Sequence, residues 1–140
     1  MSTFLSHIQN ILRWPLLVFL LHILALYSGL YANIPKLDNL LHFLGGMSIA
    51  AAALSFIAFA KHVHVMEIHT WWLRIFLTLA LVTLAAVAWE CMEYILDHAI
   101  GSHMQGDVTD TMSDMVLALC GGGIVVILSK TLNQYAIHNN

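Results

Sequence analysis

The sequence predicts an all-α fold, a polytopic membrane four-helix bundle made by a single integral membrane domain of residues 1–140. The chain is 60% hydrophobic and 9% charged, with a mean hydropathy of +0.81, whereas soluble domains carry roughly 25% charged residues. Its apolar residues also form four runs, each near the length of about 20 residues that a spanning helix needs. Short polar segments separate these runs, as expected for loops between spans.

The first predicted span covers residues 11–32 and is interrupted by Arg13 and His22. Because this run is longer than the roughly 7–15-residue apolar core of a cleaved signal peptide, we expect a retained helix. Pro15 lies near its start, where proline is tolerated. For His22, a hydrogen bond between helices is a better interpretation than a ligand role.

The second predicted span covers residues 37–60 and carries Asp38 and His42 near its beginning. These two side chains are four residues apart, so a helix places them on one face. Gly45 and Gly46 follow, and such small residues let membrane helices approach each other closely.

The third predicted span covers residues 70–96 and begins with two tryptophans, which suit a membrane interface. Glu90 and Glu93 lie near its end, three residues apart and therefore on one face. Residues 97–106 are predicted to form a loop, and Asp97 is expected to be a solvated acid of that loop.

The fourth predicted span covers residues 108–129 and is opened by three aspartates at positions i, i+3 and i+7: Asp107, Asp110 and Asp114. On a helix this spacing puts all three on one face. The rest of the span is almost wholly apolar, with three glycines at 121–123 that form a small face. Carboxylates that lead into a hydrophobic layer persist mainly where they pair, bind ions or carry protons.

Four spans place both termini on one side of the membrane. That side collects Arg13, Lys61, Arg74 and Lys130, and the other side has Lys36. The positive-inside rule therefore predicts that both termini are cytoplasmic. Five basic residues are too few for a nucleic-acid surface, so the expected partners are membrane lipids.

Six of the eight acids and one histidine are predicted to meet at the outer end of the spans, which has a single lysine. Two carboxylates about 5 Å apart repel by roughly 3 kcal/mol at an effective dielectric of 20. Bound cations or shared protons would relieve this repulsion. The expected metal ligands come from spans two to four: Asp38, His42, Glu93, Asp110 and Asp114. Oxygen-rich ligation with one imidazole suits Mg, Mn or Fe, and Zn is also an option.

A divalent metal near the outer leaflet can activate water or polarise a phosphate. This favours a metal-dependent membrane hydrolase or transferase that acts on a lipid-linked or phosphate-containing substrate, with Glu90 or Asp107 as general base. Asp107 can equally be a helix N-cap. The alternatives that stay open are a cation or proton transporter subunit, a structural protein with a metal staple, and a hydrogen-bonded network without chemistry.

Three motifs carry a resemblance to a known family: Asp38-x-x-x-His42 with Gly45-Gly46, Glu90-x-x-Glu93-Tyr94, and Gly106-Asp107-x-x-Asp110-x-x-x-Asp114-Met115. Over residues 37–123 the chain resembles the YjdF-like family of bacterial inner-membrane proteins, a domain of unknown function. The resemblance implies a location in the bacterial inner membrane and an acidic core. It implies no reaction, and it leaves open whether the chain works alone or as a homo-oligomer.

Overall fold

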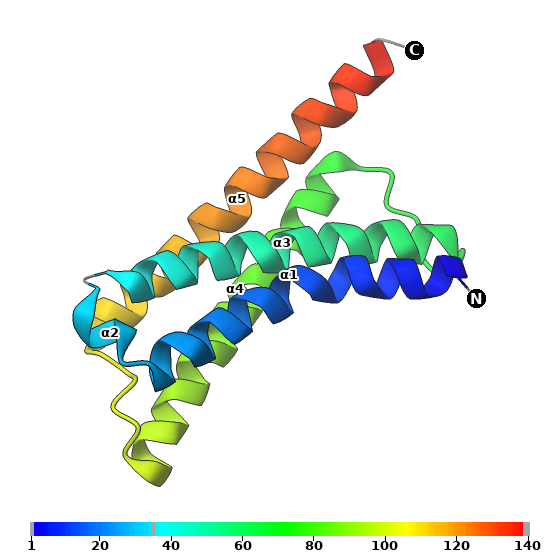
Figure 1. The fold of residues 1–140 in the computed structure, drawn as a ribbon. Coiled ribbons are helices and arrows are strands. Elements are labelled where there is room, and N and C mark those ends of the chain that lie inside the picture. Colours follow the sequence, from blue (N-terminus) through cyan, green and yellow to red (C-terminus); the bar gives the residue numbers. More distant parts are fainter. Residues whose placement is uncertain (1, 35, 139–140) are drawn as a thin grey trace.

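The structure, a computed structural model, describes residues 2–34 and 36–138. These ranges contain helices and no strand: α1 (Ser2–Tyr27), α2 (Leu30–Asn33), α3 (Leu37–His62), α4 (Trp71–Ile100) and α5 (Val108–His138) (Figure 1). Four helices are long and apolar enough to cross a membrane, over Phe4–Tyr27, Leu37–His62, Trp71–Ile100 and Val108–Thr131. The predicted all-α membrane bundle is therefore confirmed.

Helix α3 is central, because it packs against α1, α4 and α5, while α4 also packs against α5. The turn around α2 and the connection from α4 to α5 lie at the left and lower left of Figure 1. The connection from α3 to α4 lies on the opposite side, together with the beginning of α1 and the end of α5. The four long helices therefore alternate in direction.

Two glycines allow a close crossing of α3 and α5. A Cβ atom built on Gly46 would lie 1.9 Å from the carbonyl oxygen of Ala118, and one built on Gly121 would lie 2.1 Å from the carbonyl oxygen of Phe43. Neither position has room for a side chain, so the two backbones are in direct contact, as small residues permit in membrane helices. The expected close approach is confirmed at these two glycines.

Helix α1 is displaced toward the N-terminus relative to the predicted span 11–32. It extends to earlier residues, where Phe4 packs edge-on against Phe59 of α3 with ring centroids 5.6 Å apart. It ends earlier because the Ser28 hydroxyl donates to the carbonyl four residues before it at 2.6 Å, and Gly29 adopts a left-handed φ of 68°. Glycine accepts this conformation without steric cost, and α2 follows as a separate short helix.

Helix α4 continues past its predicted end, so the expectation that Asp97 belongs to a loop is wrong. The Asp97 carboxylate accepts hydrogen bonds from the backbone N–H groups of Met104 at 2.8 Å and Gln105 at 3.1 Å, and from the Ser102 hydroxyl. Gly101, with φ 63°, ends the helix four residues later. Asp97 thus belongs to the last turns of α4 and fixes the loop that leads to α5.

Candidate metal centre

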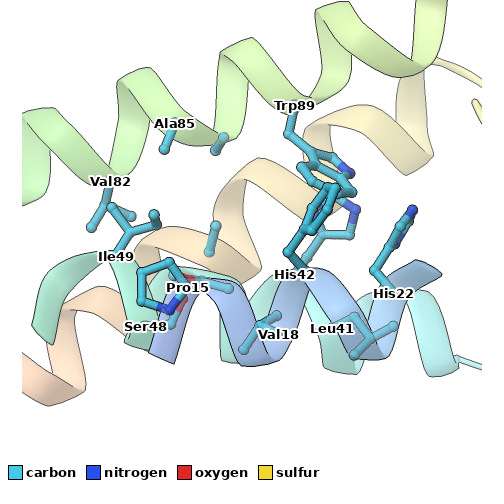
Figure 2. A pocket seen from close by; sticks show the side chains of 15 residues that line it. Pro15, Val18, His22, Leu41, His42, Ser48, Ile49, Val82, Ala85 and Trp89 are labelled. Atoms are coloured by element: carbon cyan, nitrogen blue, oxygen red, sulfur yellow. The ribbon is translucent and has the colours of Figure 1, made fainter. Parts of the chain in front are cut away.

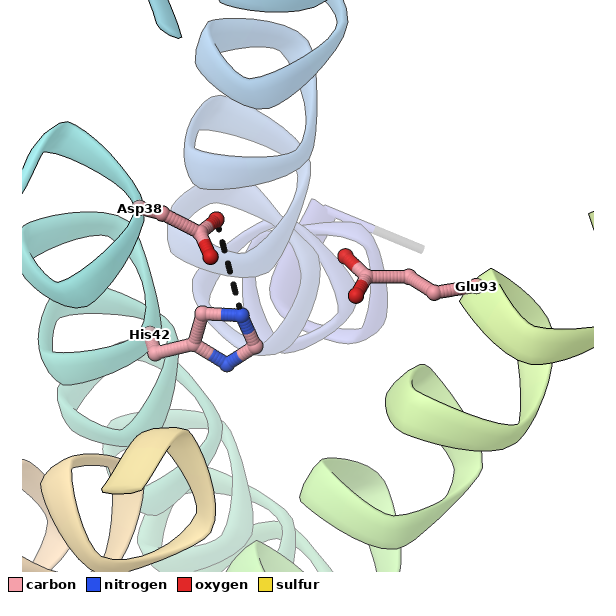
Figure 3. Close-up of side chains that lie close together, drawn as sticks. All are labelled: Asp38, His42 and Glu93. Atoms are coloured by element: carbon pink, nitrogen blue, oxygen red, sulfur yellow. Dashed lines mark ion pairs between the residues drawn. The ribbon is translucent and has the colours of Figure 1, made fainter. Parts of the chain in front are cut away.

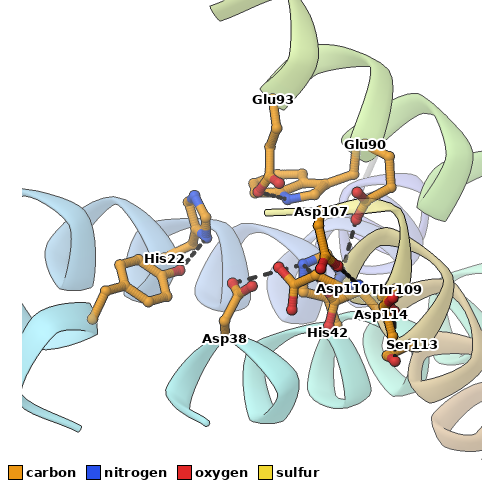
Figure 4. Close-up of polar contacts among 12 residues, drawn as sticks. His22, Asp38, His42, Glu90, Glu93, Asp107, Thr109, Asp110, Ser113 and Asp114 are labelled. Carbon is orange, nitrogen blue, oxygen red and sulfur yellow. Dashed lines mark hydrogen bonds and ion pairs between the residues drawn. The ribbon is translucent and has the colours of Figure 1, made fainter. Parts of the chain in front are cut away.

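His42 lies in the second turn of α3 and is surrounded by carboxylates from three helices. Its Nε2 is 3.7 Å from Asp38 Oδ1, one turn earlier on α3, and 3.8 Å from Asp114 Oδ2 on α5. Its Nδ1 is 3.8 Å from Glu90 Oε1 on α4. Figure 4 shows these side chains directed toward one another. All three distances exceed a normal hydrogen bond, so there is space between the groups.

Three overlapping sets of side chains have ligand atoms that all lie within 4.8 Å of one another. The sets are Asp38, His42 and Glu93 (Figure 3); His42, Glu90 and Asp114; and Asp38, Asp110 and Asp114. We call these six residues the acidic cluster. They comprise the five residues predicted as ligands together with Glu90. The geometry allows a metal to bind, and ligation itself remains a prediction.

Four residues of the acidic cluster are buried, and Asp38 and Asp110 are half-buried. The exposed fraction is 2% for Asp114, 4% for Glu93 and 6% for Glu90. Three buried atoms from three helices have no hydrogen-bond partner: His42 Nε2, Glu90 Oε1 and Asp114 Oδ1. An unsatisfied buried polar atom costs about 1–3 kcal/mol, and a charged one costs more. Such atoms are therefore rare unless a further ligand satisfies them.

No basic residue offsets this charge in the part of the chain that the structure describes. The ion pairs of the acidic cluster all use His42. Lys61, near the end of α3, pairs instead with Glu67 on the connection to α4, with 2.8 Å between Nζ and Oε1. The hydrogen bond and positive charge of this lysine lower the pKa of Glu67.

Asp107 lies outside all three sets. Its Oδ1 accepts a hydrogen bond from the backbone N–H of Asp110 at 2.9 Å, and its carbonyl oxygen accepts one from the N–H of Thr111 at 3.1 Å. The side chain is exposed. Asp107 is therefore the N-cap of α5, which was one of its two expected roles. The alternative role as a general base remains a prediction without support from its position.

Glu93 is held by a neighbour on its own helix. The indole N–H of Trp89, four residues earlier, donates a hydrogen bond of 2.8 Å to Glu93 Oε1. The sequence analysis assigned no contact to this tryptophan. Its i, i+4 spacing to a buried acid was the available signal, because such residues meet on a helix.

Tyr31 and His22 form a second polar group beside the acidic cluster, and Tyr31 was missed by the sequence analysis. The Tyr31 hydroxyl lies 2.5 Å from Nδ1 of His22, which is buried with 4% exposure. Burial raises the pKa of Tyr31, and carboxylates of the acidic cluster raise it further: Asp38, Glu93 and Asp114. Tyr31 therefore stays protonated and can act as the donor. This bond between α1 and α2 supports the hydrogen-bonding interpretation of His22.

A family model described as "Predicted membrane protein (DUF2238)" matches residues 4–134. The chain therefore belongs to this membrane protein family. The match confirms the expected membership of an uncharacterised membrane family, while the YjdF-like name stays a prediction. The comparison with curated proteins gives no match. The comparison with solved structures gives none either.

Proposed function

We propose that this member of the DUF2238 membrane protein family binds a divalent metal ion in the acidic cluster. The observation that carries the proposal is the trio of buried, unpartnered atoms His42 Nε2, Glu90 Oε1 and Asp114 Oδ1. Their residues form one of the sets within ligand distance. Buried carboxylates without basic partners are costly, and a cation would satisfy both their charge and their free lone pairs.

The overlap of the sets also fits two neighbouring ions. Asp38 and Asp114 each belong to two of the three sets, and a carboxylate has two oxygens that can bridge two ions. His42 offers the single imidazole. This donor set suits Mg, Mn or Fe, and zinc can use it too. The hydrogen bond from Trp89 orients Glu93, as is usual for the partners of metal-binding carboxylates.

The reaction that we infer is hydrolysis or group transfer on a lipid-linked or phosphate-containing substrate. When bound, a divalent ion polarises phosphoryl oxygens and lowers the pKa of water. Glu90 is the better candidate for a general base, through the carboxylate oxygen that ligation by Oε1 leaves free, because it lies within the cluster, whereas Asp107 already caps α5. No lysine or arginine pairs with the acidic cluster in the described ranges, so the binding of phosphate would fall to the metal.

The positive-inside rule supports an orientation in which the acidic cluster faces the outer leaflet and both termini are cytoplasmic. We infer a location in the bacterial inner membrane from the family resemblance. A cysteine placed in the loop at 101–106 should then react with a membrane-impermeant maleimide in intact cells.

Elemental analysis of protein purified without chelator tests the metal proposal. We expect a divalent metal in at least one copy per chain, and a loss of about tenfold or more in affinity for Asp114→Asn, which removes charge at nearly constant shape. Asp107→Asn is the matched control, because asparagine also caps helices and the side chain lies outside the sets. Metal-free wild type, or equal metal content in the two variants, would overturn the proposal.

A structural role for the metal is the second candidate, and the origin of the ligands favours it. They come from α3, α4 and α5, so one ion would join three helices. In that case chelation should lower the unfolding temperature strongly. If chelation abolishes activity on a phosphate-containing lipid while the unfolding temperature changes little, the enzyme role is favoured instead.

A further inference from the structure

A cavity of about 130 Å³ lies beside the acidic cluster, between α1, α3 and α4. Most of its wall is apolar, formed by residues such as Val18, Ile49, Val82 and Ala85 (Figure 2). Ser48 also lines it, but the Ser48 hydroxyl donates to the carbonyl of Gly45 at 2.7 Å. Because this part of the wall offers few polar groups that could hold a water, it suits hydrocarbon.

The polar side chains of the cavity gather at one end. His22, His42 and Trp89 line it there, as Figure 2 shows. His42 is the central residue of the acidic cluster, and the indole of Trp89 donates to Glu93. The same side chains therefore form the end of the cavity and the border of the candidate metal centre. A molecule that fills the cavity would reach the metal centre with its polar end.

The cavity is not fully enclosed, and α1 and α4 form two of its sides. These two helices do not approach each other within 8 Å between Cα atoms in the described ranges. Phe19 and Trp89 meet edge-on between them, with ring centroids 6.1 Å apart. Both helices are candidate membrane spans, so the hydrocarbon layer would surround them in a bilayer. Hydrocarbon chains are therefore the apolar molecules available to a cavity among these spans.

We propose that the cavity binds the part of a hydrocarbon chain nearest to the head group of a single-chain anionic amphiphile, with the head group at the acidic cluster. The position of the head group rests on the proposed metal function. An engineered apolar cavity of about 150 Å³ takes up benzene, so a cavity of about 130 Å³ accepts roughly six carbon atoms. The remaining chain would extend from the cavity into the bilayer.

Gly45 offers a direct way to fill the cavity. It lines the cavity, and a Cβ atom built on it meets nothing within 4 Å. Gly45→Leu would therefore occupy the space of the chain without a clash at the Cβ atom. Gly123→Leu is the matched control, because a Cβ atom there also meets nothing within 4 Å and Gly123 does not line the cavity.

The test uses an alkyl phosphate that carries a diazirine within its first few carbons, added to the full-length protein in detergent. After irradiation, labelled residues are mapped by mass spectrometry, and metal content is measured on the same samples. Unlabelled dodecyl phosphate and farnesyl phosphate compete in separate arms, which distinguishes a linear chain from a methyl-branched one. Circular dichroism checks that each variant is folded.

We expect the label on wall residues of the cavity, such as Val18, Ile49 and Ala85. Labelling there should fall about tenfold in Gly45→Leu, equivalent to about 1.4 kcal/mol of binding, and remain near wild type in Gly123→Leu. Label spread over lipid-facing residues and insensitive to Gly45→Leu would overturn the proposal, even with metal present. Cavity labelling in metal-free wild type would support the chain site while overturning the metal function.

Discussion

Substitution of Gly46 by alanine should open the acidic cluster, because Gly46 fixes the distance between α3 and α5. His42 lies four residues before Gly46, and Asp114 lies four residues before Ala118, which Gly46 contacts. Each candidate ligand is thus one helical turn, about 6 Å, from the crossing point. The crossing therefore determines how closely the two ligands approach each other.

The expected displacement follows from the contact at the crossing. The new Cβ atom of Gly46→Ala would lie 1.9 Å from the carbonyl oxygen of Ala118, whereas ordinary contact begins at 3.4 Å. Relief by backbone separation requires about 1.5 Å. The same shift would take His42 Nε2 and Asp114 Oδ2 from 3.8 Å to about 5.3 Å, beyond ligand distance. Such overpacking costs about 1–3 kcal/mol, partly offset by about 1 kcal/mol of helix propensity.

The assay is the metal content of Gly46→Ala together with its thermal unfolding in detergent. Gly45→Ala is the matched control, because it gains the same helix propensity while its Cβ atom meets nothing within 4 Å. We expect a large loss of metal in Gly46→Ala and wild-type metal content in Gly45→Ala. If both variants hold metal and unfold like wild type, the inference that the crossing sets the ligand distance is refuted.

Three further predictions test other contacts. Tyr31→Phe should destabilise the protein by about 1–3 kcal/mol in thermal unfolding, because the buried Nδ1 of His22 loses its partner; an unchanged unfolding temperature would contradict this. Asp97→Ala should speed amide exchange in the loop before α5, because the Asp97 carboxylate accepts hydrogen bonds from the backbone N–H groups of this loop. Helix content should not change. Glu67→Gln should change the unfolding temperature little at neutral pH, since its pair with Lys61 is exposed. Because Lys61 lowers the pKa of Glu67, any stabilisation should be present at neutral pH and vanish as the pH falls through that pKa, where wild type and variant should coincide.

The meeting of the acids could be predicted because helix geometry converts sequence position into depth. Each residue adds 1.5 Å along a helix, so Asp38, Glu90 and Asp114 could be placed at one level once the spans were assigned. The spacing within each helix then predicted which side chains share a face. The structure brings these three residues together around His42, with no need for information beyond periodicity and hydropathy.

The same geometry failed for residues at the ends of helices. Asp107 continues the spacing of Asp110 and Asp114, but α5 begins at Val108, so the helical face does not extend to it. Asp97 was assigned to a loop, but it lies in α4. Its carboxylate accepts hydrogen bonds from backbone N–H groups of the loop that follows the helix. Hydropathy locates the end of a span to within about one helical turn. That turn decides whether an acid caps the helix, binds the N–H groups of the next loop or points into the bundle.

The difference between Gly45 and Gly46 shows what only packing can decide. The two glycines are adjacent, so their Cα–H bonds point about 100° apart around the helix. The sequence analysis assigned them the same role. Gly46 meets the backbone of α5, whereas Gly45 faces open space at the cavity. A side chain at position 46 would separate the candidate ligands of α3 and α5. A side chain at position 45 would fill the cavity. One Gly-Gly pair therefore allows α3 to pack closely on α5 and still leaves room beside α1 and α4, which the proposed metal centre and the proposed chain site both require.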